Sequence, residues 1–195
     1  MPPVQSTDLT VSRKKFNREI AEFRSLGEQY RQRGWFLTHA KYPHAMVILA
    51  TPKVKPSMIL TGVSFDYTNY DAMPPSVRLV NPFTGEAFKN SELPTQLMRA
   101  LPEQHIAEQI MVQPQQPYMQ AYGPNDIPFL CVAGVREYHE HPGHSGDLWD
   151  MHRPSGAGRL VRIIEIISKY GLETITGIGI QMIPKISFNF GSPPR

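Results

Sequence analysis

One segment of the sequence, residues 128–149 (PFLCVAGVREYHEHPGHSGDLW), holds the residues best suited to chemistry. It contains the single cysteine of the chain, Cys131, followed by carboxylates and imidazoles at short spacings. The candidate site residues are Cys131, Glu137, His139, His141 and His144. A thiolate is both a nucleophile and a metal ligand, and an imidazole serves as a base or a ligand near neutral pH. We therefore expect the functional site here.

The first half of this segment is typical of a β-strand, in which residues of the same parity point to the same face. Cys131, Glu137, His139 and His141 all have odd numbers. An unbroken strand would place these four side chains on one face. His144 follows a Pro-Gly turn and could fold back toward them.

One chemistry that fits these residues is acyl transfer without a cofactor. Cys131 would accept an activated carboxyl group as a thioester and pass it to an amine or a hydroxyl. A thiol has a pKa near 8.5, so it needs a neighbouring imidazole, which His139 or His141 could supply. Glu137 would orient that histidine, and His144 or a backbone N–H could stabilise the oxyanion.

The alternative chemistry is a zinc site, structural or catalytic. Zinc binds thiolate, imidazole and carboxylate groups in a tetrahedron. The ligand set would be drawn from Cys131, Glu137, Glu140, His139, His141 and His144. A sulfur atom bound to zinc is a poor free nucleophile, so the two interpretations compete for Cys131.

Two further interpretations stay open. The segment HEHPGHSGD is similar to the metal-binding signature of JAB-type peptidases, but Ser145 and Asp147 follow the HxHP element at a shorter spacing. In the other interpretation the cysteine is a buried apolar residue, the histidines are solvated, and Trp149 is core packing. Surface positions are expected for His39, His44, His105 and Arg136.

Length and composition favour a single domain without a membrane or nucleic-acid partner. The chain has 195 residues, a 41% hydrophobic fraction and a net charge of +3. No apolar run approaches the roughly 20 residues that span a bilayer, and no apolar signal core is present at the N-terminus. Basic residues are not clustered with aromatic ones. We expect a cytoplasmic protein with a disordered N-terminus (1–11), one domain (12–190) and a loose C-terminus (191–195).

The first half of the chain predicts a helix followed by an antiparallel meander. Apolar residues recur at helical spacing between residues 12 and 33, and Gly34 is placed to end that helix. Strands are expected at 35–40 and 45–50, joined as a hairpin, and then at 58–67 and 76–80. This order indicates an α+β fold.

The second half is less regular. One or two short helices are expected within 93–110, and a Pro- and Gln-rich extended segment at 113–128 could act as a flap over the site. The clearest helix lies near the end, where Leu160, Ile163, Ile164 and Ile167 form an apolar stripe. A strand-like alternation follows it from about residue 173.

With these elements in order, the chain resembles ubiquitin-conjugating enzymes. The shared features are the N-terminal helix, the four-stranded meander, the segment PPSVRLV (74–80), a later cysteine at 131 and a following helix. The resemblance implies that fold and a thioester-forming Cys131. The His-Pro-Asn tripeptide of that family is missing upstream of Cys131, so a different group must stabilise the oxyanion.

The central segment itself is similar to a bacterial family of predicted metal-binding proteins named for a Cys, Glu, His, His signature. The matching positions are Cys131, Glu137 and two among His139, His141 and His144. That family is associated with ubiquitin-like modification operons. The resemblance implies a ubiquitin-like modifier, its activating enzyme and a deconjugating peptidase as partners.

Overall fold

The computed structural model of the protein describes residues 5–101, 104–107, 110–112, 114–177 and 179. The first half contains two helices and four strands. They are α1 (Leu9–Ser25), α2 (Gly27–Gln32), β1 (Trp35–Lys41), β2 (His44–Thr51), β3 (Met58–Asp66) and β4 (Ser76–Val80). None of the described helices has the length and apolar character needed to cross a membrane.

The four strands form one antiparallel sheet in the order β1-β2-β3-β4, so each strand pairs with the next along the chain. Trp35 pairs with Leu49 across the first hairpin, and Val63 pairs with Val47 and with Leu79. Together with the helices, this meander confirms the predicted α+β class. The strand expected at 76–80 has those bounds in the structure.

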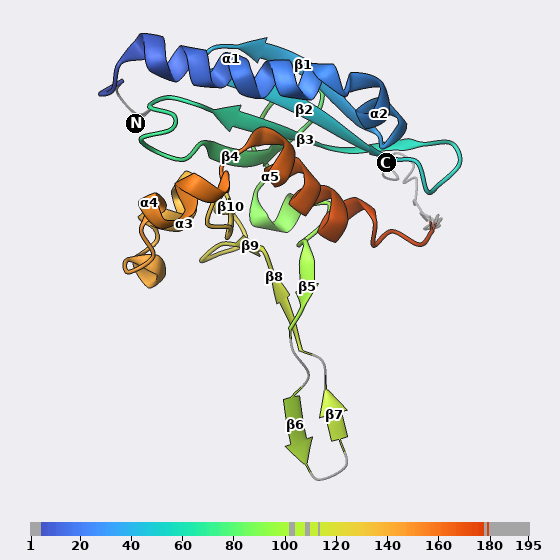
Figure 1. Ribbon diagram of the computed structural model, residues 1–195. Coiled ribbons are helices and arrows are strands. Elements are labelled where there is room, and N and C mark those ends of the chain that lie inside the picture. Colours follow the sequence, from blue (N-terminus) through green and yellow to red (C-terminus); the bar gives the residue numbers. More distant parts are fainter. Residues whose placement is uncertain (1–4, 102–103, 108–109, 113, 178, 180–195) are drawn as a thin grey trace, which may run out of the picture.

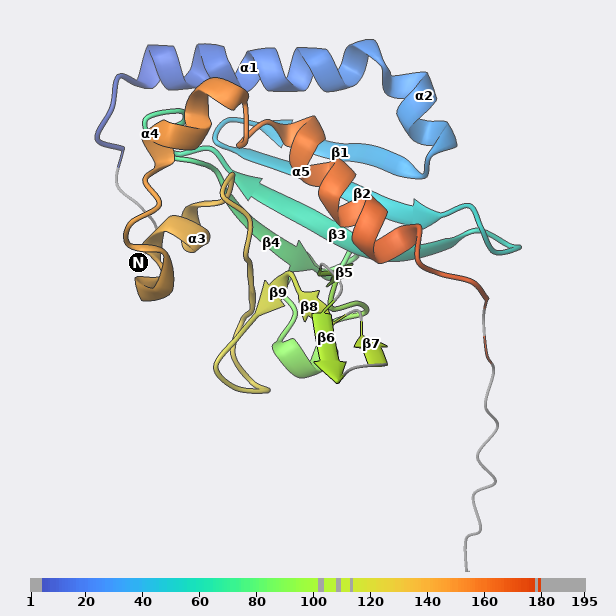
Figure 2. The ribbon, with the colours of Figure 1, turned by 60° about the horizontal axis from the view of Figure 1, so that its bottom comes forward.

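Helices α1 and α5 (Leu160–Ile167) cover the same face of the sheet, as Figure 2 shows. Alternate strand residues, including Val47, Val63 and Val77, point into this core and are almost completely buried. The predicted apolar stripe of α5 is confirmed, because its members have no exposed surface. Burying each such side chain stabilises the fold by roughly 1.5–3 kcal/mol. This core fixes α5, which begins close to the candidate site.

The N-terminal helix begins earlier than the sequence predicts. The Asp8 carboxylate accepts hydrogen bonds from the N–H groups of Thr10 and Val11, which caps α1 and starts it at Leu9. The backbone N–H groups of Ser6 and Thr7 donate to the Asn69 side chain. The prediction of disorder is therefore wrong for residues 5–11, while residues 1–4 lie outside the described part.

Between the sheet and the site the chain forms a long two-stranded arm that extends away from the body (Figure 1). Its base is β5 (Met98–Ala100) paired with β8 (Gln115–Pro117), and beyond it β6 (Gln104–Ala107) pairs with β7 (Ile110–Val112). The predicted helices within 93–110 are wrong. Leu97 has a φ of 54°, in the left-handed region, which ends any helical path before the arm.

The last described element after α5 is a π-helical turn, Ser168–Leu172. The strand expected from about residue 173 is absent over 174–177, where the described backbone forms a turn and then coil. The rest of that expectation, and the loose terminus at 191–195, fall outside the described residues.

Candidate active site

The segment that carries the candidate residues is folded differently from the prediction. Strand β10 covers only Phe129–Leu130 and pairs with β9 (Met119–Gln120). Helix α3 (Arg136–Glu140), a 3-10 turn (Pro142–His144) and helix α4 (Trp149–His152) follow it. The expected strand through residue 141 is wrong, so residue parity does not place the candidate side chains together.

The side chain of Arg136 explains why a helix forms here. We expected Arg136 at the surface, but it is only 4% exposed. Its guanidinium donates to the carbonyl oxygens of Pro74, Asp66 and Thr68, and its Nη1 lies 3.6 Å from the Asp66 carboxylate. A buried guanidinium needs acceptors of this kind, and these lie at the end of β3 and in the connection to β4.

Glu137 is a second anchor between α3 and the sheet. Its carboxylate accepts a hydrogen bond from the Ser76 hydroxyl and lies 3.0 Å from the Arg78 guanidinium. The Val77 N–H also donates to it, at 3.4 Å. Among the described residues Glu137 thus contacts β4 and no histidine, contrary to the orienting role that we expected.

A close backbone approach fixes the loop that follows Cys131. A Cβ atom at Gly134 would lie 2.0 Å from the carbonyl oxygen of Ala157, just before α5. Only glycine permits this contact. The loop after Cys131 is therefore packed directly against the entry to the helix that the core holds.

These anchors bring Cys131 next to His144. The Cys131 Sγ and the His144 Nε2 are 3.4 Å apart, within hydrogen-bond distance for sulfur. Both side chains are half-buried. They line a cleft of about 550 Å³ whose other walls come from β5, β8, α3 and α4. The return of His144 toward the thiol after the Pro-Gly turn is confirmed.

The imidazole of His144 rests on the ring of Tyr138. The ring centroids are 3.9 Å apart and the planes differ by 18°, which is a stacked arrangement. The Tyr138 hydroxyl donates to the Asp147 carboxylate at 2.6 Å, and the other oxygen of Asp147 contacts His152 Nε2. Asp147 and His152 thus hold the Tyr138 ring in place, and this ring forms the platform on which His144 stacks.

The other two candidate histidines are engaged elsewhere. His139 contacts the carbonyl oxygens of Ala133 and Asp147 through its two ring nitrogens, at 2.6 and 2.7 Å. His141 accepts a hydrogen bond from the Gly143 N–H on Nδ1, so its Nε2 carries the proton and donates to the Tyr122 hydroxyl at 2.8 Å. Neither of them contacts Cys131 in the structure.

Arg99 is a site residue that the sequence reasoning missed. Its guanidinium lines the cleft beside Cys131 and donates to the side-chain oxygen (Oε1) of Gln116, its partner across the β5-β8 ladder. It also lies 4.8 Å from the centre of the Tyr118 ring. No local motif marks Arg99, because only the pairing of two strands on either side of the arm brings it to the thiol.

Comparison with known proteins shows the family of this chain. The model of the Y4jH-like family, described as the Y4jH family, matches residues 7–175. The chain belongs to the Y4jH family. An uncharacterized protein y4jH of Sinorhizobium fredii (strain NBRC 101917 / NGR234) is 44% identical over 178 residues, which is 88% of this chain and 87% of that protein.

The Y4jH family match spans every residue of the cleft. Arg99, Cys131, Tyr138 and His144 all lie within residues 7–175. The match also includes α1 and the meander, so the family model covers all of the described helices and strands. The site belongs to the part of the chain that the Y4jH family shares.

The electrostatics of the cleft favour a protonated thiol at rest. Burial raises the pKa of the Cys131 thiol above its ordinary value, and the positive charge of Arg99 acts in the opposite direction. Burial and the hydrogen bond to Asp147 raise the pKa of Tyr138 to about 12. Cys131 therefore needs a base when it reacts, and His144 is the base within reach.

The described residues do not fit a zinc site. No group of three or more His, Cys, Asp or Glu side chains in this part of the chain is arranged to hold a metal ion. Cys131 and His144 are two possible ligands, whereas a structural zinc site needs four and a catalytic one three. Glu137, His139 and His141 are each committed to the contacts given above.

The remaining predictions about side chains concern three histidines and Trp149. His39 and His44 are exposed, as expected, whereas the side chain of His105 lies outside the described part. Trp149 is 9% exposed and its indole N–H donates to the Asp71 carbonyl oxygen, which confirms core packing.

Proposed function

We propose that this protein is a cysteine-dependent transferase of a bacterial ubiquitin-like conjugation pathway, in which Cys131 carries the C-terminal carboxyl group of a modifier as a thioester. The 3.4 Å contact between Cys131 Sγ and His144 Nε2 is the observation that carries this proposal. A protonated thiol with an adjacent imidazole matches the requirements of a base-assisted nucleophile.

The loading step uses the residues of the cleft. His144 Nε2 takes the thiol proton while Cys131 Sγ forms a bond to the activated carbonyl carbon. The bond from that carbon to its leaving group, such as the thiol of an activating enzyme, then breaks, and the leaving group takes the proton from His144. Arg99, whose positive charge acts on the same sulfur, stabilises the oxyanion. The step needs no oxidant, reductant or cofactor.

The second step transfers the acyl group to an amine or a hydroxyl of a target. His144 takes a proton from the attacking group, a new C–N or C–O bond forms, and Cys131 leaves as the thiol. Arg99 thereby takes the role that the missing asparagine has in ubiquitin-conjugating enzymes. The similarity of the central segment to the Cys, Glu, His, His family supports a modifier, an activating enzyme and a deconjugating peptidase as partners.

Zinc binding in the same pathway is the second candidate function. It would use the same sulfur, with His144 as the neighbouring ligand and Glu137, His139 or His141 recruited by rearrangement of the loop. The loss of the Glu137 contacts with β4 would oppose that rearrangement.

One experiment separates the two functions. Purified protein and the Cys131→Ala variant are treated with a peptide thioester, and intact masses are recorded with and without excess free thiol, alongside elemental zinc analysis. We expect a thiol-sensitive acyl adduct on the unmodified protein only, with no stoichiometric zinc. Stoichiometric zinc that the variant loses, together with no adduct, would overturn the transferase proposal.

A further inference from the structure

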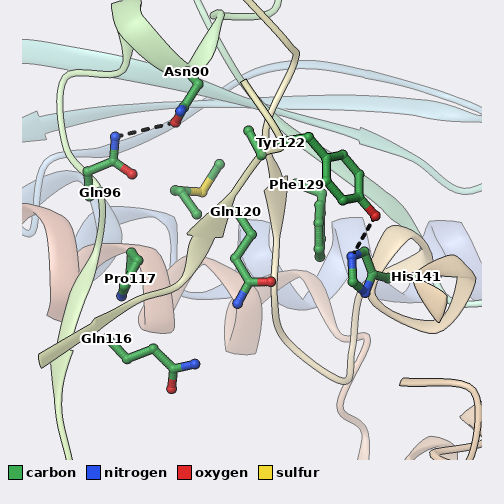
Figure 3. A pocket seen from close by; sticks show the side chains of 10 residues that line it. Asn90, Gln96, Gln116, Pro117, Gln120, Tyr122, Phe129 and His141 are labelled. Atoms are coloured by element: carbon green, nitrogen blue, oxygen red, sulfur yellow. Dashed lines mark hydrogen bonds between the residues drawn. The ribbon is translucent and has the colours of Figure 1, made fainter. Parts of the chain in front are cut away.

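A groove next to the cleft is lined mainly by amide side chains and aromatic rings. It has a volume of about 590 Å³. Its polar walls are Asn90, Gln96, Gln116 and Gln120, and its aromatic wall is made by Tyr122 and Phe129. Figure 3 shows Gln96 and Gln116 on one side, the two aromatic rings on the other, and Gln120 between them.

The groove adjoins the cleft of Cys131. Gln116, Gln120 and His141 line both cavities. The end of a ligand that lies in the groove is therefore next to the cleft at Gln120. Arg99, which Gln116 holds, stands on the cleft side of this junction.

The groove carries no formal charge. None of its lining residues is a lysine, an arginine or a carboxylate. His141 is neutral in this arrangement, since its Nδ1 accepts a hydrogen bond from Gly143 N–H. A charged ligand group would lose water here without gaining an opposite charge. Charge complementarity thus favours an uncharged ligand segment in the groove.

Several amide atoms in the groove are available to a ligand. Within the described residues the side chain of Gln120 makes no hydrogen bond, and Gln116 uses only its carbonyl oxygen, which accepts from Arg99. Gln96 donates to Asn90 Oδ1 at 3.5 Å, which leaves its own oxygen available. An amide side chain donates and accepts at once, as the backbone of an extended peptide does.

We propose that this groove binds an uncharged, extended peptide segment whose C-terminal carbonyl carbon reaches Cys131. The inference rests on the proposed transferase function and names the segment that the site selects: the terminal residues of the acyl donor, rich in small or polar neutral side chains. Gln96 and Gln120 hydrogen-bond its backbone, and Tyr122 and Phe129 cover its side chains.

Binding is tested separately from chemistry. A fluorescent hexapeptide of glycine and serine, ending in a carboxamide, is titrated into the Cys131→Ala variant, which cannot form a thioester. We expect binding that weakens by about fivefold for each lost hydrogen bond when Gln96→Ala or Gln120→Ala is added. The exposed amide of α2 provides the matched control, Gln29→Ala, which should bind as the parent does.

The charge preference is tested with hexapeptides of equal length that carry aspartate or lysine residues. Weaker binding of both is expected. Equal or tighter binding of a charged peptide, no binding of any peptide, or no effect of Gln96→Ala and Gln120→Ala would each overturn the groove proposal.

Acylation then separates the groove from the proposed function. Gln120→Ala should slow the transfer of the peptide thioester to Cys131 by about fivefold, whereas Gln29→Ala on α2 should leave the transfer of both the peptide and a short acetyl group unchanged. If Cys131 is acylated by the acetyl thioester as fast as by the peptide thioester, the transferase proposal stands and the groove proposal is overturned. Peptide binding without any acylation of Cys131 would overturn the transferase instead.

Discussion

The ring of Tyr138 lies flat against the imidazole of His144, with centroids 3.9 Å apart. This contact fixes the direction in which His144 presents Nε2 to Cys131. The platform is held in turn by Asp147, which accepts a hydrogen bond from the Tyr138 hydroxyl. The orientation of the proposed base thus depends on the ring of Tyr138, which directly follows the α3 anchors Arg136 and Glu137, rather than on a carboxylate bound to the imidazole.

Two substitutions of Tyr138 should distinguish the effect of its stacking on His144 from the effect of its hydrogen bond to Asp147. Tyr138→Phe keeps the ring and should acylate Cys131 at close to the parent rate. Tyr138→Leu removes the ring, and the misplaced imidazole should slow acylation by about 100-fold. Acylation rates by intact-mass sampling measure both effects. Equal rates for the two variants would contradict the platform role.

His144→Ala should slow the acylation of Cys131 by about 10²–10⁴-fold, because the thiol loses its base. The folded structure should be retained, since His144 lies in an exposed turn and its ring is only half-buried. His39→Ala is the matched control, because His39 is exposed on β1. The rate constant with a peptide thioester is the measurement, and a parent-like rate for His144→Ala would exclude it as the base.

The pH dependence of thiol reactivity should show the raised pKa of Cys131. Burial favours the neutral thiol, so the rate of alkylation by iodoacetamide should rise with pH to a midpoint above the ordinary value for cysteine. Arg99→Leu removes a charge that favours the thiolate and should move this midpoint further upward. Arg24→Leu, an exposed position on α1, is the control and should leave it unchanged.

Gly134→Ala should destabilise the protein by about 1–3 kcal/mol or more, because its Cβ would lie 2.0 Å from the Ala157 carbonyl oxygen. Gly146→Ala is the matched control, since nothing lies within 4 Å of a Cβ placed there. Urea denaturation of both variants measures the free energy of unfolding. Equal free energies of unfolding for the two variants would show that the backbone at Gly134 can move away from Ala157 with little loss of stability.

The sequence predicts the scaffold well where its patterns are local. The stripe of α5 reflects burial on one face, which a helix imposes through its own periodicity. The turn between β1 and β2 is marked by a proline, Pro43. The predicted helix start at residue 12 is wrong for two reasons. The cap at Asp8 is the signal of a single residue, and the contacts of Gln5–Thr7 with Asn69 depend on tertiary structure.

Of the candidate site residues, the structure brings only His144 into contact with Cys131. Cys131 and His144 were both named from their chemistry, yet the strand geometry that joined Cys131 to His139 and His141 was wrong. The burial of Arg136 decides the local fold, and its acceptors are carbonyl oxygens about 70 residues away along the chain. Arg99 was missed for the same reason, because strand pairing across the arm carries no local pattern.

The pairing of β5 with β8 closes the arm at its base, where the Leu101 N–H donates to the Pro114 carbonyl oxygen. Arg99 and Gln116 lie on the body side of that closure. Insertions or deletions beyond it would leave the spacing between these two side chains unaltered. The arm can therefore change in length without altering the wall that Arg99 and Gln116 give to the cleft of Cys131.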